Sequence, residues 1–294
     1  MKPEFLKKGD TIGVVAPARK IAAAEIQLAV DTLKSWGLNV IFGSHLFRSY
    51  HQFSGTDEER AQDLQRMLDD PAVKAIISAR GGYGTLRIID RLDFTGFMRN
   101  PKWIIGYSDL TVLHAHLHNL GWSSLHAPML IDFFKNAEAT DSIRRFLFGE
   151  KISYQAASHP LNRKGKAEGI LTGGNLSLLY AIAGSRSDID TKGKILFLED
   201  LDEYLYHIDR MMMNLERSGK LAHLAGLVVG SMTAMKDNLI PFGKSAEEII
   251  AQAVSKYDYP VCYGFPAGHA EKNLALPFGE RAKLDIADLA ALSF

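Results

Sequence analysis

The sequence predicts an α/β fold whose first part is a mainly parallel sheet, followed by a smaller α/β domain. Short apolar runs alternate with amphipathic segments up to about residue 120, which is typical of βαβ units. The alternation fades into a polar, irregular stretch at about 132–166 and then resumes. We therefore expect an N-terminal domain over 1–140, a linker region over 141–165 and a C-terminal domain over 166–294.

The first half contains four apolar runs, each followed by a helical pattern. Several runs end in glycine or small residues, and their continuous apolar character suits strands buried on both faces. Thr56 and Glu59 form a capping-box pattern, which makes the helix after them the clearest of the set. Strands are expected at 11–18, 39–43, 73–80 and 102–108, and helices at 22–37, 56–70, 81–93 and about 109–120.

The second half has its own strands and helices. Apolar runs separated by longer amphipathic segments again indicate strands joined by helices. Strands are expected at 194–200, 226–232 and 259–265, with helices near 204–219 and 244–257.

Composition excludes several classes of function. Lys plus Arg equals Asp plus Glu at 34 each, so no net charge attracts nucleic acid or an anionic membrane. The N-terminal segment is charged, and no window approaches the apolar length of a membrane span. Cys262 is the single cysteine, which excludes an intrachain disulfide and fits a reducing compartment. We expect a cytoplasmic protein that binds neither nucleic acid nor membrane.

Polar loops follow several of the expected strands, where open α/β sheets bind their ligands. The loop "RGGYG" is neither a Walker A loop nor a G-x-G-x-x-G motif. Its glycines suit either a tight turn or backbone N–H groups that approach an anion. The four loops are "ARGGYG" at 79–84, "GYSD" at 106–109, "LEDLDE" at 198–203 and "GFPAGHAEKN" at 264–273.

Ser108 lies between a strand and a helix, and local sequence allows two interpretations. Serine in this position commonly caps the helix. A strand-to-helix turn also projects a serine hydroxyl outward, with the N–H of Asp109 available as an oxyanion donor. The motif is G-Y-S-D, however, and differs from the G-x-S-x-G of α/β-hydrolases. A nucleophile would need a base and an acid to orient that base.

Histidines and carboxylates elsewhere could supply these partners. His114 and His118 share a helix face, but the H-E-x-x-H glutamate is missing, which argues against a zinc peptidase. His269 follows a strand in a glycine-containing loop. Glu199 ends the apolar run "KILFLED" and is the candidate for the acid, with Asp200 as its nearest rival. The other explanation for Glu199 is a structural one, as a helix N-cap partner or a member of an ion pair.

Six blocks of sequence together resemble the LD-carboxypeptidase family. This family of serine peptidases includes muramoyltetrapeptide carboxypeptidases and microcin C immunity proteins. The blocks occur in order from about residue 12 to 279, so the resemblance covers nearly the whole chain. They are "ARGGYG", "IIGYSDLTVLH", "HAPM", "TGGNLSLL", "FLEDLDEYLYHIDRMM" and "GFPAGHAEKNLALPFG".

The resemblance implies a Ser-Glu-His triad in a cleft between two α/β domains. Ser108 matches the nucleophile, Glu199 the acid and His269 the base. The oxyanion donors would be the backbone N–H groups of Gly82 and Asp109. The resemblance implies no metal and no cofactor, and it implies a homodimer.

The implied reaction removes the terminal D-alanine from a murein tetrapeptide during cytoplasmic cell-wall recycling. Such a substrate needs a group that binds its carboxylate, and Arg80, beside the glycine turn, is the candidate. One alternative is an immunity-type peptidase that cleaves an aminoacyl-sulfamoyl or related acyl nucleotide. The stretch 184–193 has no Trp or Phe to stack on a base, which favours the murein peptide. Another alternative is a non-catalytic peptide-binding protein on the same fold.

Overall fold

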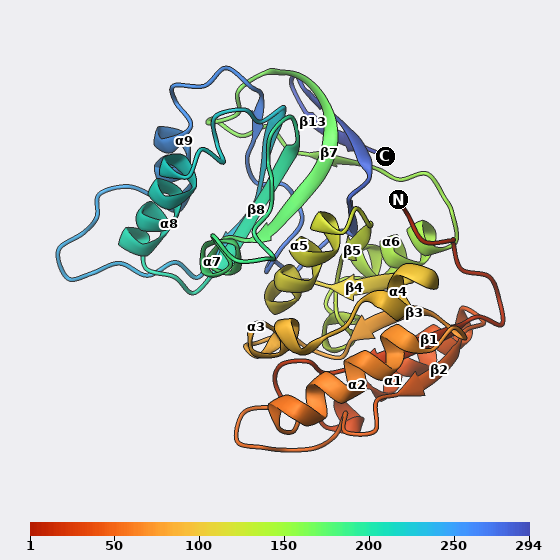
Figure 1. The fold of residues 1–294 in the computed structure, drawn as a ribbon. Coiled ribbons are helices and arrows are strands. Elements are labelled where there is room, and N and C mark those ends of the chain that lie inside the picture. Colours follow the sequence, from red (N-terminus) through yellow and green to blue (C-terminus); the bar gives the residue numbers. More distant parts are fainter.

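The first of two β-sheets contains the strands predicted in the N-terminal half. In this computed structural model, which describes residues 1–294, helices pack on the faces of both sheets (Figure 1). Five strands run parallel in the order β2-β1-β3-β4-β5, and β11 pairs antiparallel with β5. These strands are β1 (Thr11–Val15), β2 (Asn39–Phe42), β3 (Val73–Ser78), β4 (Trp103–Gly106), β5 (Ser124–His126) and β11 (Leu276–Phe278).

Helices cover both faces of this sheet. On one face, α1 (Ala23–Ser35) and α6 (Ala137–Leu147) bury their apolar sides, and α2 (Asp57–Asp69), α4 (Thr95–Arg99) and α5 (Thr111–Asn119) cover the other. The order of successive strands reverses between β1 and β3, which is the point where open α/β sheets bind ligands at the carboxyl ends of their strands. The short helices are α3 (Thr85–Ile88), η1 (Ile89–Arg91), η2 (Ser108–Leu110) and η3 (Leu130–Asp132).

The capping box predicted for α2 is confirmed. Thr56 Oγ1 accepts a hydrogen bond from the Glu59 N–H at 3.2 Å, and Glu59 Oε2 accepts one from the Thr56 N–H at 2.8 Å. Two of the N–H groups left free at the helix start are thereby satisfied.

The second sheet is mixed. Its strands run in the order β10-β9-β8-β7-β12-β13-β6, parallel from β10 to β7 and antiparallel from β7 to β6. β7 joins the halves, because one part of it pairs with β12 and the rest pairs with β8. The strands are β6 (Ser153–Ala156), β7 (Gly165–Asn175), β8 (Ile195–Leu201), β9 (Gly226–Thr233), β10 (Val261–Cys262), β12 (Arg281–Ile286) and β13 (Ala290–Ser293).

Three helices accompany this sheet and pack on one of its faces: α7 (Leu176–Ala181), α8 (Leu205–Arg217) and α9 (Ala246–Ala253). None of the protein's helices combines the length and the apolar character that crossing a bilayer requires. The boundary predicted over 141–165 contains the end of α6 and the whole of β6. The division of the chain at those bounds stays a prediction.

Candidate active site

Ser108 does not cap the helix that follows it. The residue begins the 3₁₀ turn η2, with one residue between it and the end of β4, and its φ is +62°, a left-handed conformation that non-glycine residues rarely adopt. The hydroxyl is nearly buried and lies 3.0 Å from Nε2 of His269, a residue 161 positions further along the chain. Strained backbone of this kind is concentrated at functional sites.

A buried histidine holds the end of the strand that leads to Ser108. His114 in α5 lies 2.8 Å from the Gly106 carbonyl through Nε2 and 2.8 Å from Ser124 Oγ through Nδ1. A carbonyl only accepts, so Nε2 carries the proton and Nδ1 accepts from the serine hydroxyl. Burial lowers the pKa of His114 to about 4, which keeps the ring neutral. Both nitrogens are thus engaged, and His114 has no lone pair free for a metal.

His269 connects Ser108 to Glu199. Its Nδ1 lies 2.6 Å from Glu199 Oε2, and since a carboxylate only accepts, Nδ1 donates and Nε2 is left to accept the proton of Ser108. Burial alone would lower the pKa of His269. The charge of Glu199 and its hydrogen bond outweigh burial, and the net effect is a raised pKa. The pair thus favours the imidazolium that forms when the base takes a proton.

Glu199 is fully buried near the end of β8, where the pairing with β9 changes register after Leu198. Gly268, next to the histidine, makes room for it. A Cβ on Gly268 would lie 2.9 Å from Glu199 Oε2 and 2.7 Å from Ser231 Oγ, and the φ of +107° also favours glycine. Only a residue without a side chain lets the histidine loop approach the carboxylate this closely.

Asp200, the rival for the acid, faces another set of partners. Its Oδ1 accepts from Asn175 Nδ2 at 2.8 Å, and its Oδ2 accepts from both the N–H and the hydroxyl of Ser177. Burial, with the nearby charge of Glu199, raises the pKa of Asp200 to about 6. Asp200 therefore fastens the end of β8 to the end of β7, and Glu199 is the carboxylate that contacts His269.

The side chain of Asp109 contributes a contact that the sequence did not indicate. Its carboxylate is fully buried and accepts a hydrogen bond from the Thr85 N–H at 2.7 Å, at the end of the glycine turn. Buried Arg60 donates to the Gly84 carbonyl at 3.0 Å and to Pro17. Burial raises the pKa of Asp109, whereas its hydrogen bonds and the charge of Arg60 lower it. Burial is the larger effect, so the net result is a raised pKa. The sequence predicts a role for the backbone N–H of Asp109 as an oxyanion donor, and the structure shows in addition that its carboxylate ties the serine turn to the glycine turn.

The glycine turn lies against Ser108. A Cβ on Gly81 would be 3.4 Å from the Cβ of Ser108, and Gly82 adopts a φ of +116°. Gly82, Ser108 and His269 all line one cavity of about 280 Å³, together with Arg80. The remaining lining residues are Arg19, Gly81, Tyr107, Met129, Ile131, Asp132, Lys135 and Leu201. The structure therefore brings three predicted residues of the N-terminal half, Arg80, Gly82 and Ser108, to one cavity with His269 of the C-terminal half.

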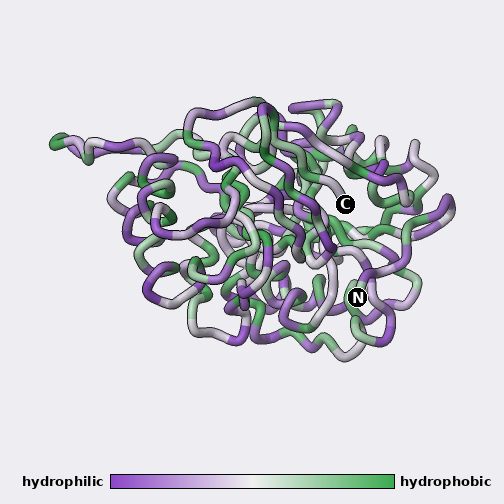
Figure 2. The backbone as a smooth tube through the Cα atoms, turned by 90° about the horizontal axis from the view of Figure 1, so that it is seen from above, coloured by the Kyte–Doolittle hydropathy of each residue, from purple (hydrophilic) through white to green (hydrophobic).

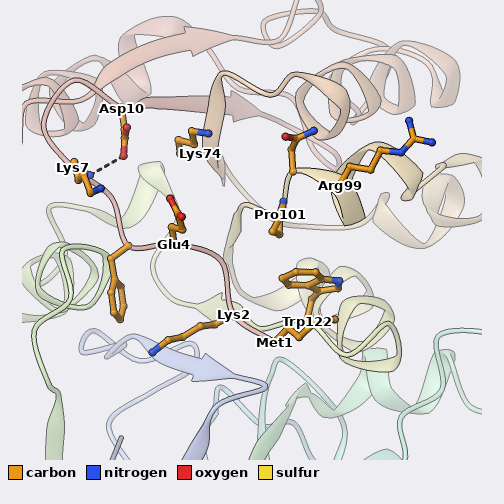
Figure 3. Close-up of a pocket in the computed structure, with 11 residues that line it drawn as sticks. Met1, Lys2, Glu4, Lys7, Asp10, Lys74, Arg99, Pro101 and Trp122 are labelled. Atoms are coloured by element: carbon orange, nitrogen blue, oxygen red, sulfur yellow. Dashed lines mark hydrogen bonds between the residues drawn. The ribbon is translucent and has the colours of Figure 1, made fainter.

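A larger cavity of about 590 Å³ contains none of these residues. It lies at the amino ends of the first sheet's strands, since Asp10 precedes β1, Lys74 is near the start of β3 and Pro101 precedes β4 (Figure 3). Four cations and two carboxylates line it, and Asp10 accepts a hydrogen bond from the Lys7 N–H. Open α/β sheets bind ligands at the opposite, carboxyl edge. The smaller cavity at Ser108 is therefore the candidate active site.

Comparison with known proteins identifies the family. Residues 12–127 match the LD-carboxypeptidase N-terminal domain, and residues 168–284 match the LD-carboxypeptidase C-terminal domain. A probable murein peptide carboxypeptidase of Bacillus subtilis (strain 168) is 38% identical over 302 residues, which cover 99% of this chain and 93% of the relative.

Solved structures agree with this match. The muramoyltetrapeptide carboxypeptidase from Oxalobacter formigenes superposes with a TM-score of 0.88 at 30% identity, over 96% of this chain and 98% of its own. The protein MccF, in complex with glutamyl sulfamoyl guanosine, also has a TM-score of 0.88, over 99% of this chain and 97% of its own. At 23% identity MccF shows a shared fold only. With both of its domains matched, this two-domain α/β protein belongs to the LD-carboxypeptidase family of serine peptidases.

Proposed function

We propose that this enzyme releases the terminal D-alanine of murein tetrapeptides by serine catalysis. The observation that carries the proposal is the chain of hydrogen bonds from Ser108 to His269 at 3.0 Å and from His269 to Glu199 at 2.6 Å. His269 takes the proton of Ser108 as its Oγ attacks the carbonyl, and later gives it to the leaving amine of D-alanine. Water then hydrolyses the acyl-enzyme, and Glu199 stabilises the imidazolium in both steps.

The oxyanion of the tetrahedral intermediate needs N–H donors. In our proposal these are the backbone groups of Gly82 and Asp109, on the two turns that the Asp109 carboxylate holds together through Thr85. Fixed donors of this kind stabilise developing charge without reorganising during the reaction. Loss of one donor in serine peptidases costs about 3 kcal/mol of transition-state stabilisation.

The cavity suits a small anionic end of a peptide. Its volume of about 280 Å³ is at the lower end of ligand pockets, and Arg80 is among the cations that line it. In our proposal Arg80 contributes positive potential that attracts the carboxylate of the terminal D-alanine. The printed names of the relatives, a murein peptide carboxypeptidase and a muramoyltetrapeptide carboxypeptidase, support the same substrate class.

The setting of this reaction belongs to the same proposal. We infer a cytoplasmic role in cell-wall recycling and a homodimer. The reduced, buried thiol of Cys262 is compatible with that compartment.

The connection 234–245 between β9 and α9 extends from one side of the molecule, with an apolar tip (Figures 1 and 2). Leu239 and Ile240 in it are almost fully exposed, which supports a protein contact there. Sedimentation analysis of the purified protein tests the dimer.

The alternative substrate is an acyl nucleotide, and the shared fold with MccF is the observation that favours it. Its base would need an open aromatic face. Besides His269, Tyr107 is the aromatic residue that lines the cavity. Its side chain is buried beside the His269 ring, with the two ring centroids 4.7 Å apart. This argues for the peptide.

One experiment separates the candidate substrates. The protein is incubated with muropeptides carrying tri-, tetra- and pentapeptides and, separately, with an aminoacyl-sulfamoyl adenosine, and the products are measured by mass spectrometry. We expect the tetrapeptide alone to lose the mass of one alanine residue. Cleavage of the nucleotide with an intact tetrapeptide would replace our proposal by the alternative, and no cleavage of either would contradict both.

A further inference from the structure

We propose that Arg19 binds the terminal carboxylate of the substrate and so makes the enzyme a carboxypeptidase. The inference rests on the proposed function, and it concerns a residue that follows β1 and contacts the glycine turn. It separates the two arginines of the cavity: Arg80 supplies potential, whereas Arg19 makes the direct contact.

The position of Arg19 follows from the strand order. The carboxyl ends of β1 and β3 lie side by side where the order reverses, and Arg19 lies just beyond the first of them and the glycine turn just beyond the second. The Arg19 N–H donates to the Gly81 carbonyl at 3.4 Å, and the residue also forms a β-bridge with Phe53. The backbone of Arg19 is thus fixed at the site where such folds bind ligands.

The stem of the Arg19 side chain lies across Gly82. A Cβ on Gly82 would be 2.2 Å from Cδ and 2.3 Å from Cγ of Arg19, so a larger residue and the arginine cannot both keep their positions. Gly82 is also the proposed oxyanion donor. Arg19 is an exposed residue that lines the cavity together with Gly82 and Ser108, so its stem lies beside the backbone that would receive the scissile carbonyl.

Among the cations of the cavity, Arg19 has a guanidinium without a protein partner. Lys135 pairs with Asp132 at 2.7 Å. The Nη1 of Arg80 donates to the Lys20 carbonyl at 3.3 Å and lies 4.0 Å from a Glu25 oxygen. No hydrogen bond or ion pair engages the Arg19 side chain. An arginine remains charged at all physiological pH values and offers paired donors that match a carboxylate.

The reaction requires a cationic group that binds the terminal carboxylate. In a tetrapeptide the terminal carboxylate is one residue away from the scissile carbonyl, so the group that binds it must lie close to the oxyanion donors. Bidentate hydrogen bonds between guanidinium and carboxylate give both energy and geometric specificity. An enzyme with this contact discriminates against a substrate whose C-terminus is an amide, because the paired charge is lost.

The test compares the binding of two ligands to the Ser108→Ala protein. The ligands are a muramoyl tetrapeptide with a free D-alanine carboxylate and the same peptide ending in D-alanine amide, measured by calorimetry. We expect the acid to bind about 10- to 100-fold more tightly than the amide, as for hydrogen bonds to charged groups. Arg19→Gln in the same background should reduce the ratio to within about threefold, and Arg19→Lys should restore part of it.

The control is Lys20→Gln, which removes the same charge from the adjacent, exposed residue outside the cavity. It should keep the ratio of the parent protein. An unchanged ratio in Arg19→Gln would overturn the inference, as would an equal loss of affinity for acid and amide, which indicates a structural role. Because binding is measured without turnover, a tetrapeptide that binds with the expected ratio but is not cleaved by the unmodified enzyme contradicts the proposed function and leaves the inference supported. Cleavage with an unaltered ratio contradicts the inference alone.

Discussion

Replacing Glu199 by Gln removes the charge that faces His269 while keeping the size of the side chain. The Nδ1–Oε2 distance is 2.6 Å, and the carboxylate is fully buried. Unit charges about 4 Å apart attract by about 4 kcal/mol at an effective dielectric constant of about 20. At about 1.36 kcal/mol for each factor of ten, loss of this attraction slows the step that forms the imidazolium about 10³-fold. Loss of the fixed tautomer adds to this, as removal of the acid does in other serine triads.

The expected result is a kcat for D-alanine release about 10³- to 10⁴-fold below the parent value, with a smaller change in KM because Glu199 does not line the cavity. The pH profile gives a second signature. His269 must be neutral to accept a proton, so activity is lost as pH falls through its raised pKa, above 6.5. Without the Glu199 carboxylate, burial is opposed only by the charges of Asp200 and Asp132, so the pKa of His269 falls and the acidic limb of kcat/KM moves to lower pH.

The matched control is Glu203→Gln, because Glu203 holds His207 in a similar pair at 2.6 Å, away from the cavity. This variant should retain the parent rate within about threefold, since its pair takes no part in proton transfer. If Glu199→Gln keeps more than about a tenth of the parent kcat, or leaves the acidic limb in place, the assignment of Glu199 is refuted.

Three further predictions concern the residues around the triad. Gly268→Ala should cost about 1–3 kcal/mol of stability and at least about tenfold in kcat, because the new methyl displaces Glu199; unchanged kinetics would count against the tight approach. Asp109→Ala should cost about 1–3 kcal/mol in denaturant unfolding, because the Thr85 N–H loses its acceptor, whereas Asp109→Asn, which still offers an oxygen, should recover most of the loss. His114→Asn should destabilise the protein more at pH 7 than at pH 4.5. The pKa of His114 is lowered to about 4, so its stabilising contribution is present above about 6.5 and declines as pH falls toward 4; equal differences at the two pH values would contradict this.

Much of the site could be predicted because strand ends can be recognised in sequence. Ser108, Glu199 and His269 each follow or end an apolar run, and the carboxyl ends of parallel strands collect functional groups. Which carboxylate contacts the histidine could not be decided locally, since Glu199 and Asp200 are adjacent. Their orientations depend on the change of register in β8, which is a property of the folded sheet.

Other features escaped prediction for physical reasons. β7 is rich in glycine, β12 is half polar, and β13 is only four residues long, so the antiparallel part of the second sheet has weak local signals. The role of the Asp109 carboxylate arises from contact with a turn 24 residues earlier. His114 looked like part of a histidine run, and its contact with the end of β4 appears only when α5 packs against the sheet.

In our proposal Ser108 is the nucleophile of a carboxypeptidase, and the release of D-alanine by a variant without its hydroxyl tests this role. Purified protein and its Ser108→Ala variant, shown to be equally stable, are incubated with muramoyl tetrapeptide, and free D-alanine is quantified over time. The structure predicts steady release by the parent enzyme and a loss of at least about 10³-fold in the variant. Release by the variant at the parent rate would contradict the account, because no proton path through His269 would then be needed.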